Sequence, residues 1–91
     1  MKKQLYIQVY GKVQGVFFRS QAAKRAQELG LKGWIRNSDD GTVEIVAQGE
    51  DSALTVFSEW CRVGPPGSDV ERTHWKWSDQ QGEFKGFEIR D

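Results

Sequence analysis

Alternating apolar and polar positions divide this chain into strand-like and helix-like segments. Near the start, Leu5, Ile7 and Val9 alternate with more polar residues, which predicts a strand with one face toward a core. Residues 19–29 carry apolar side chains at helical spacing with charged residues between them, and Gly30 follows as an expected C-terminal cap. The chain therefore opens with a strand followed by an amphipathic helix.

The rest of the chain continues with strands and one more helix. Residues 31–37 and 42–48 are strand-like and flank an Asp-Gly pair, which predicts a hairpin. A second helix is expected from Asp51 or Ser52, either of which can cap it, to Val63, where a Gly-Pro-Pro-Gly segment ends it. Residues 73–77 alternate as another strand, and Phe87 and Ile89 indicate a short terminal one. By their period, the expected core includes Trp60, Cys61, Trp75 and Trp77.

The order strand, helix, strand, strand, helix, strand predicts an α+β fold, the ferredoxin-like βαββαβ sandwich. We expect an antiparallel sheet in the order 4-1-3-2, with the short extra C-terminal strand beside it and two helices on one face. The length of 91 residues fits one domain spanning residues 1–91.

The segment GKVQGVFFR, residues 11–19, lies between the first strand and the first helix. A glycine-bearing loop at a helix N-terminus directs backbone N–H groups and the positive end of the helix dipole at one spot. Arg19 adds a planar fork of donors that suits phosphate oxygens. The segment predicts a phosphate-binding loop whose candidate residues are Gln14, Gly15, Val16, Phe17, Phe18 and Arg19.

The predicted topology brings a second segment to this loop. The first and second strands run in the same direction, so the loop and Asn37, which closes the second strand, lie at one edge of the sheet. With one strand between them, their backbones are about 10 Å apart. A phosphoryl group and a water molecule fit between Arg19 and Asn37 at that separation.

Composition narrows the classes of function. Thirteen Lys and Arg balance thirteen Asp and Glu, so no overall field draws the chain to nucleic acid or to an anionic membrane. One cysteine and one histidine are too few for a zinc site of those ligands, and a lone Cys61 fits a reducing, cytoplasmic setting. Asp39 and Asp40 are expected to be solvated turn residues, and His74 a strand-face residue without catalytic duty. No additional apolar stripe indicates self-association, so a monomer is expected.

Two long segments resemble the signatures of the acylphosphatase family. Residues 11–19 are similar to the first, and residues 33–44, GWIRNSDDGTVE, to the second; the resemblance continues through residues 64–66, 70–72 and 87–90. It implies hydrolysis of acyl phosphates with no metal or organic cofactor, and inorganic phosphate as product and competitive ligand. By the same resemblance, Arg19 binds the phosphate, Asn37 holds the attacking water and residues 14–19 surround the phosphate with N–H groups. Ser38, where threonine is common, and the terminal Asp91 depart from the family pattern.

The chemistry of an acyl phosphate explains why so few residues suffice. Its leaving group is a carboxylate whose conjugate acid has a pKa near 4, so it departs without a general acid. Positioning and charge stabilisation remain, and these dominate phosphoryl transfer.

Two other classes of function compete with the enzyme. A non-catalytic anion-binding or regulatory module of the same fold would keep the loop but has no use for Asn37. An RNA-binding sheet would use the aromatic residues as a stacking platform, but the basic-aromatic signature of that module is absent and the net charge is zero. Trp34 alternates to the face opposite Ile35, where it covers the sheet or the acyl part of a substrate.

Overall fold

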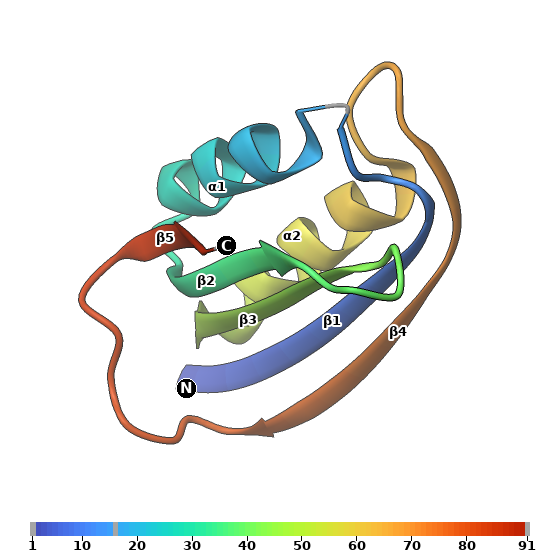
Figure 1. Cartoon of the computed structure of the whole chain (residues 1–91). Helices are drawn as coiled ribbons and strands as arrows, with labels where there is room; N and C mark the ends of the chain where they lie inside the picture. Colours follow the sequence, from blue (N-terminus) through green and yellow to red (C-terminus); the bar gives the residue numbers. More distant parts are fainter. Residues whose placement is uncertain (1, 16, 91) are drawn as a thin grey trace.

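Two helices lie side by side on one face of a five-stranded sheet (Figure 1). The structure, a computed structural model, describes residues 2–15 and 17–90 of the chain. In chain order, the elements are β1 (Lys2–Lys12), α1 (Phe18–Glu28), β2 (Lys32–Asn37), β3 (Val43–Glu50), α2 (Asp51–Val63), β4 (Asp69–Asp79) and β5 (Phe87–Arg90). This is the predicted ferredoxin-like arrangement.

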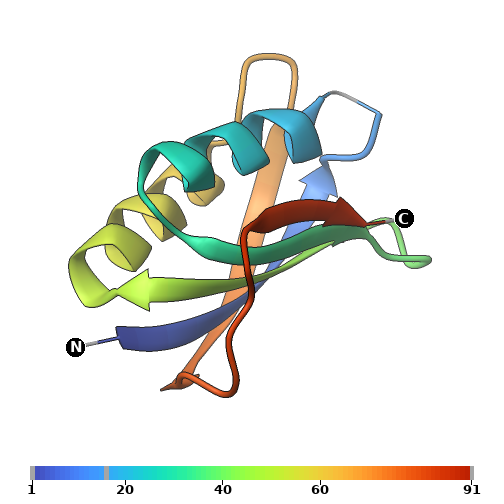
Figure 2. The same ribbon diagram turned by 90° about the vertical axis from the view of Figure 1, so that its left-hand side faces the viewer.

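The strands are ordered β4-β1-β3-β2-β5. β1 pairs antiparallel with β3 and β4, and β2 pairs antiparallel with β3, which confirms the predicted order 4-1-3-2. β5 is the expected extra strand; it extends the sheet beyond β2 and runs parallel to it. Because β1 and β2 are both antiparallel to β3, their C-terminal ends lie at the same edge, where the loop before α1 also lies (Figure 2).

The core lies between the sheet and the two helices. β1 buries Leu5, Ile7 and Val9, the residues expected from its alternation. The helices contribute buried residues at helical spacing: Phe18, Ala22 and Ala26 from α1, and Leu54, Phe57 and Cys61 from α2. Burial raises the pKa of the Cys61 thiol, which keeps it protonated and unreactive.

The predicted caps of the second helix are wrong. Neither Asp51 nor Ser52 precedes α2; the residue at its N-cap is Glu50, in an extended conformation and without a side-chain capping hydrogen bond. β3 ends at Glu50 and α2 begins at Asp51, so no loop separates them. The last residue of the strand therefore occupies the cap, and Asp51 instead places its charge in the first helical turn, where the dipole favours it.

Two of the three tryptophans expected in the core are exposed. Trp75 is 55% and Trp77 41% exposed, whereas Trp60 is partly buried and stacks on Phe57. Trp75 and Trp77 pair with Ile7 and Leu5, so the period assigned them to the correct face. β4 is one of the two edge strands of the sheet, and these two side chains remain exposed there.

Neither helix of the described chain is long and apolar enough to cross a membrane.

Candidate active site

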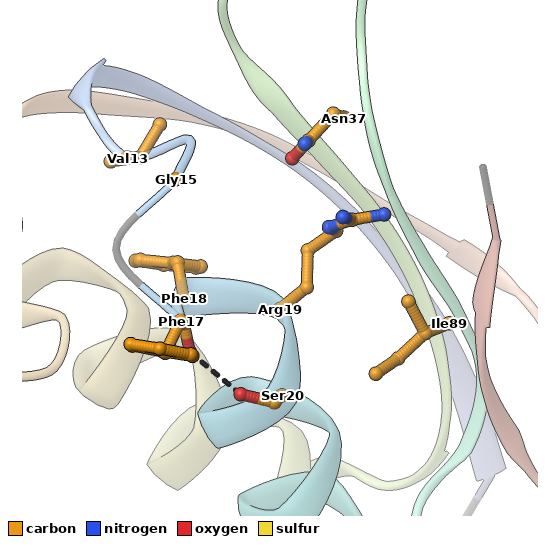
Figure 3. Close-up of a pocket in the computed structure, with 8 residues that line it drawn as sticks. All are labelled: Val13, Gly15, Phe17, Phe18, Arg19, Ser20, Asn37 and Ile89. Atoms are coloured by element: carbon orange, nitrogen blue, oxygen red, sulfur yellow. Dashed lines mark hydrogen bonds between the residues drawn. The ribbon is translucent and has the colours of Figure 1, made fainter.

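A cavity of about 290 Å³ opens where the loop before α1 meets the end of β2 (Figure 3). Its walls come from the loop, the first turn of α1 and the ends of β2 and β5. The residues that line it are Val13, Gly15, Phe17, Phe18, Arg19, Ser20, Asn37 and Ile89. The structure thus brings Arg19 and Asn37, distant in sequence, to one cavity.

Two of the described loop residues have the left-handed backbone conformation. Gly15 has φ 73° and Phe17 has φ 60°, immediately before α1 begins at Phe18. A Cβ at Gly15 would have open space around it, and Gly15 lines the cavity. N–H groups of a first helical turn have no acceptor within the helix, which suits this end of α1 to an anion.

Arg19 extends its guanidinium over the cavity from the first turn of α1. Its Nη1 donates a hydrogen bond of 3.1 Å to the backbone oxygen of Arg90 in β5. Figure 3 shows the guanidinium between Asn37 and Ile89. The first turn of α1 contains no acidic residue, so the positive charge adds to the positive end of the helix dipole. Two sources of positive potential therefore point to an anion at this place.

Asn37 is the last residue of β2 and lines the same cavity. Its Oδ1 is buried and finds no hydrogen-bond partner among residues 2–15 and 17–90. Buried acceptors in folded proteins are nearly always paired, so a buried acceptor without one beside a cavity indicates a ligand or water that donates to it.

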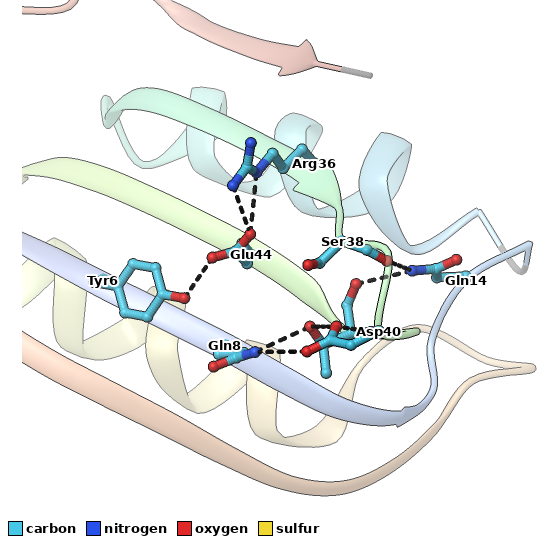
Figure 4. Close-up of polar contacts among 8 residues, drawn as sticks. Tyr6, Gln8, Gln14, Arg36, Ser38, Asp40 and Glu44 are labelled. Carbon is cyan, nitrogen blue, oxygen red and sulfur yellow. Dashed lines mark hydrogen bonds and ion pairs between the residues drawn. The ribbon is translucent and has the colours of Figure 1, made fainter.

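The side chain of Gln14 has a role that the sequence did not reveal. Gln14 does not line the cavity; its Nε2 donates hydrogen bonds to the backbone oxygens of Ser38 (2.8 Å) and Thr42 (2.9 Å) (Figure 4). These contacts join the loop to the β2–β3 hairpin that carries Asn37. The predicted backbone role of Val16 lies outside the described residues, as does Asp91.

We expect Gln14→Ala to lower the free energy of unfolding by about 1–3 kcal/mol, because two hydrogen bonds to hairpin carbonyls are lost. Urea unfolding monitored by tryptophan fluorescence measures this loss. Gln21→Ala, which removes an exposed glutamine from α1, is the matched control. Equal stability of the two variants would show that the contacts of Gln14 do not hold the loop to the hairpin.

The hairpin loop is organised by its own hydrogen bonds. Asp40 Oδ1 accepts from the backbone N–H of Thr42 (3.0 Å) and from its hydroxyl (2.6 Å), and these bonds hold the pKa of the Asp40 carboxyl below its usual value. Gly41 has φ 89°, as expected for the hairpin glycine. No group of three or more potential metal ligands occurs among the described residues. Asp40 is thus a turn residue that shapes the loop after Asn37.

The sequence model of the acylphosphatase family matches residues 5–89 of this chain. This range includes all the residues that line the cavity. The chain belongs to the acylphosphatase family. A relative from Thiobacillus denitrificans named acylphosphatase is 46% identical over 88 residues, 97% of each chain. One of the same name from Pyrobaculum calidifontis is 51% identical over 85 residues, covering 92% of this chain and 77% of the relative. With such identity over most of its length, the chain is an enzyme of this family.

Solved acylphosphatase structures have the same fold. The crystal structure of acylphosphatase from Bacillus subtilis superposes with a TM-score of 0.95 at 38% identity, covering 98% of this chain and 99% of that one. The superposition covers nearly the whole of both chains, so this chain has the fold of that acylphosphatase.

Three residues that line the cavity were not predicted from the sequence as site residues: Val13, Ser20 and Ile89. Val13 and Ser20 flank the predicted loop, and Ser20 donates a hydrogen bond of 3.1 Å to the backbone oxygen of Phe17. Ile89 belongs to the alternating C-terminal segment, but nothing in its spacing showed that β5 would pair with β2. Only the pairing of β5 brings it to the site.

Trp34 lies on the face of the sheet away from the helices and does not line the cavity. The Cζ atoms of Arg36 and Arg90 lie 5.4 and 5.1 Å from its ring centroid. Nearby, Glu44 accepts hydrogen bonds from Tyr6 and Arg36 (Figure 4). Of the two interpretations from the sequence, covering of the sheet fits Trp34, and contact with the acyl part of a substrate does not.

Proposed function

We propose that this acylphosphatase hydrolyses the carboxyl–phosphate bond of acyl phosphates to a carboxylate and inorganic phosphate, without a metal ion. Arg19 and the backbone N–H groups of the loop hold the phosphate, and Asn37 positions the attacking water. The observation that carries the proposal is the shared cavity, lined by Arg19 at the N-terminus of α1 and by Asn37, whose buried Oδ1 has no hydrogen-bond partner among the described residues.

Each residue has a defined part in the reaction. Arg19 and the first turn of α1 stabilise the charge that spreads over the equatorial phosphate oxygens in the transition state. The amide of Asn37 is not a base near neutral pH, but its Oδ1 accepts a hydrogen bond from the water and fixes its direction of attack. The water oxygen bonds to phosphorus, the carboxylate leaves with the electrons of the broken P–O bond, and the phosphate product carries both water protons.

One assay tests the proposal: hydrolysis of acetyl phosphate in the presence of a chelator, with inorganic phosphate as competitor. We expect turnover that the chelator does not reduce, and competitive inhibition by phosphate. Amide NMR shifts of residues 15–19 on addition of phosphate, without turnover, would instead support a non-catalytic anion-binding module. Turnover that the chelator abolishes would contradict the metal-free mechanism.

The rate should be nearly independent of pH between about 5 and 8, because the proposed mechanism uses no general acid or base from the protein. Any variation is expected to follow the ionisation of the substrate's own phosphate, which 31P NMR of free acetyl phosphate measures. Initial rates at fixed ionic strength give the profile. A bell-shaped profile with a midpoint that the substrate does not share would reveal an acid or base in the protein.

A further inference from the structure

Two exposed apolar side chains line the cavity that holds Arg19 and Asn37. The described chain has six exposed large hydrophobic residues, namely Phe17, Val56, Val63, Trp75, Trp77 and Ile89. Phe17 is the most exposed of them at 80%, and Ile89 is 47% exposed. Both line the cavity, whereas none of the other four does. The cavity thus combines exposed apolar side chains with the Arg19 guanidinium and the Asn37 amide.

The conformation of Phe17 makes its exposure more informative. Within residues 2–15 and 17–90 it is the one non-glycine residue at positive φ, with φ 60° and ψ 21°. This region is unfavourable for a bulky side chain, and glycine adopts it without strain, as Gly15 does two residues earlier. A phenyl ring at position 17 therefore does not stabilise the backbone conformation of the loop, and it is not buried in the core. Strain of this kind is concentrated at ligand sites.

Ile89 reaches the cavity from the other side. It pairs in parallel register with Ile35 of β2, which is fully buried beneath the helices, so both side chains lie on the same face of the sheet. The next residue, Arg90, accepts the hydrogen bond from Arg19, so β5 is fixed to the first turn of α1 beside Ile89. In Figure 3, Asn37 lies on one side of the Arg19 guanidinium, and Phe17 and Ile89 lie on the other.

In-line phosphoryl transfer requires this separation. The attacking water and the leaving carboxylate lie on opposite sides of the phosphorus. A water held by Asn37 therefore directs the acyl group away from Asn37, toward Phe17 and Ile89. A charged or strongly hydrated acyl group would lose water against these side chains, whereas an apolar one would cover them.

We propose that Phe17 and Ile89 form the acyl-binding part of the site and that the preferred substrates are acyl phosphates with an apolar, and especially an aromatic, acyl group. This inference rests on the proposed function, because it assumes that the phosphate lies beside Arg19 and the water beside Asn37. It assigns to the side chain of Phe17 a role separate from that of its backbone.

The test compares kcat/KM for benzoyl phosphate with kcat/KM for acetyl phosphate. Both substrates carry the same phosphate, and the ratio does not depend on the fraction of folded enzyme. We expect Ile89→Ala and Phe17→Gly each to lower the ratio about three- to ten-fold relative to wild type. Glycine at position 17 keeps the backbone conformation while removing the ring. Val56→Ala, which truncates a 46% exposed side chain on α2, is the matched control and should leave the ratio unchanged.

The outcomes separate this inference from the proposed function. Hydrolysis of both substrates with the same ratio in wild type and in both cavity variants would overturn the acyl-binding role and leave the hydrolase standing. Hydrolysis of neither substrate by the wild type would overturn both. In a measurement that needs no turnover, phenylphosphonate should bind the wild type more tightly than methylphosphonate, and the difference should shrink in Ile89→Ala.

Discussion

Arg19→Ala is expected to weaken phosphate binding and lower turnover together. Among the described residues that line the cavity, Arg19 is the charged one, and the planar fork of its guanidinium matches the phosphate oxygens. We expect kcat/KM for benzoyl phosphate to fall by about 10³-fold, because in the proposed mechanism the lost group stabilises charge in both the bound state and the transition state. The inhibition constant of inorganic phosphate should rise in parallel. Steady-state kinetics and phosphate titration measure both quantities.

Stability should change little in this variant. A basic side chain in a first helical turn is opposed by the helix dipole, so its removal offsets part of the lost hydrogen bond to Arg90. Arg25→Ala, which removes an arginine from the last turn of the same helix, is the control and should retain wild-type kinetics. Arg19→Lys keeps the charge without the fork, and its activity should lie between those of wild type and Arg19→Ala. Wild-type phosphate affinity in Arg19→Ala would contradict the assignment.

Local periodicity was sufficient to predict most of the fold. Alternation in β1 and the apolar stripe of α1 each depend on residues that are buried by adjacent elements, so the pattern in sequence reproduces the pattern of burial. The same reasoning failed for Trp75 and Trp77. Periodicity predicts which face of a strand a residue occupies, but whether a helix covers that part of the face depends on where α2 lies over the sheet, and no local pattern encodes this.

Part of the site was predictable from the sequence. Strand direction alone predicted that Arg19 and Asn37 lie close together, because β1 and β2 both run antiparallel to β3. The side-chain contacts of Gln14 and the position of Ile89 were not predictable. Both depend on segments that meet only in the folded chain: the hairpin after β2 for Gln14, and the parallel pairing of β5 for Ile89. The left-handed conformation of Phe17 was also missed, since the residue type argues against it.

Asn37→Ala is expected to lower kcat by about 10²- to 10³-fold while the inhibition constant of inorganic phosphate stays within about two-fold of wild type. In the proposed mechanism Asn37 contacts the water and not the phosphate, so its loss should affect the transition state more than ground-state binding. Steady-state kinetics with benzoyl phosphate and phosphate inhibition give both values. Near wild-type turnover in this variant would exclude the water-positioning role.

Stability distinguishes a functional from a structural role for Asn37. Its buried Oδ1 has no partner within the described chain, and an unpaired buried acceptor costs about 1–3 kcal/mol. Asn37→Ala should therefore maintain or raise the free energy of unfolding even as kcat falls, whereas loss of a structural asparagine would lower it. Asn37→Asp is the complementary variant: a carboxylate in the cavity would repel the anion, so phosphate inhibition should weaken there but not in Asn37→Ala. If Asn37 serves catalysis at a cost in stability, we expect three results together: a lower kcat and an unchanged or higher free energy of unfolding in Asn37→Ala, and weaker phosphate inhibition in Asn37→Asp alone.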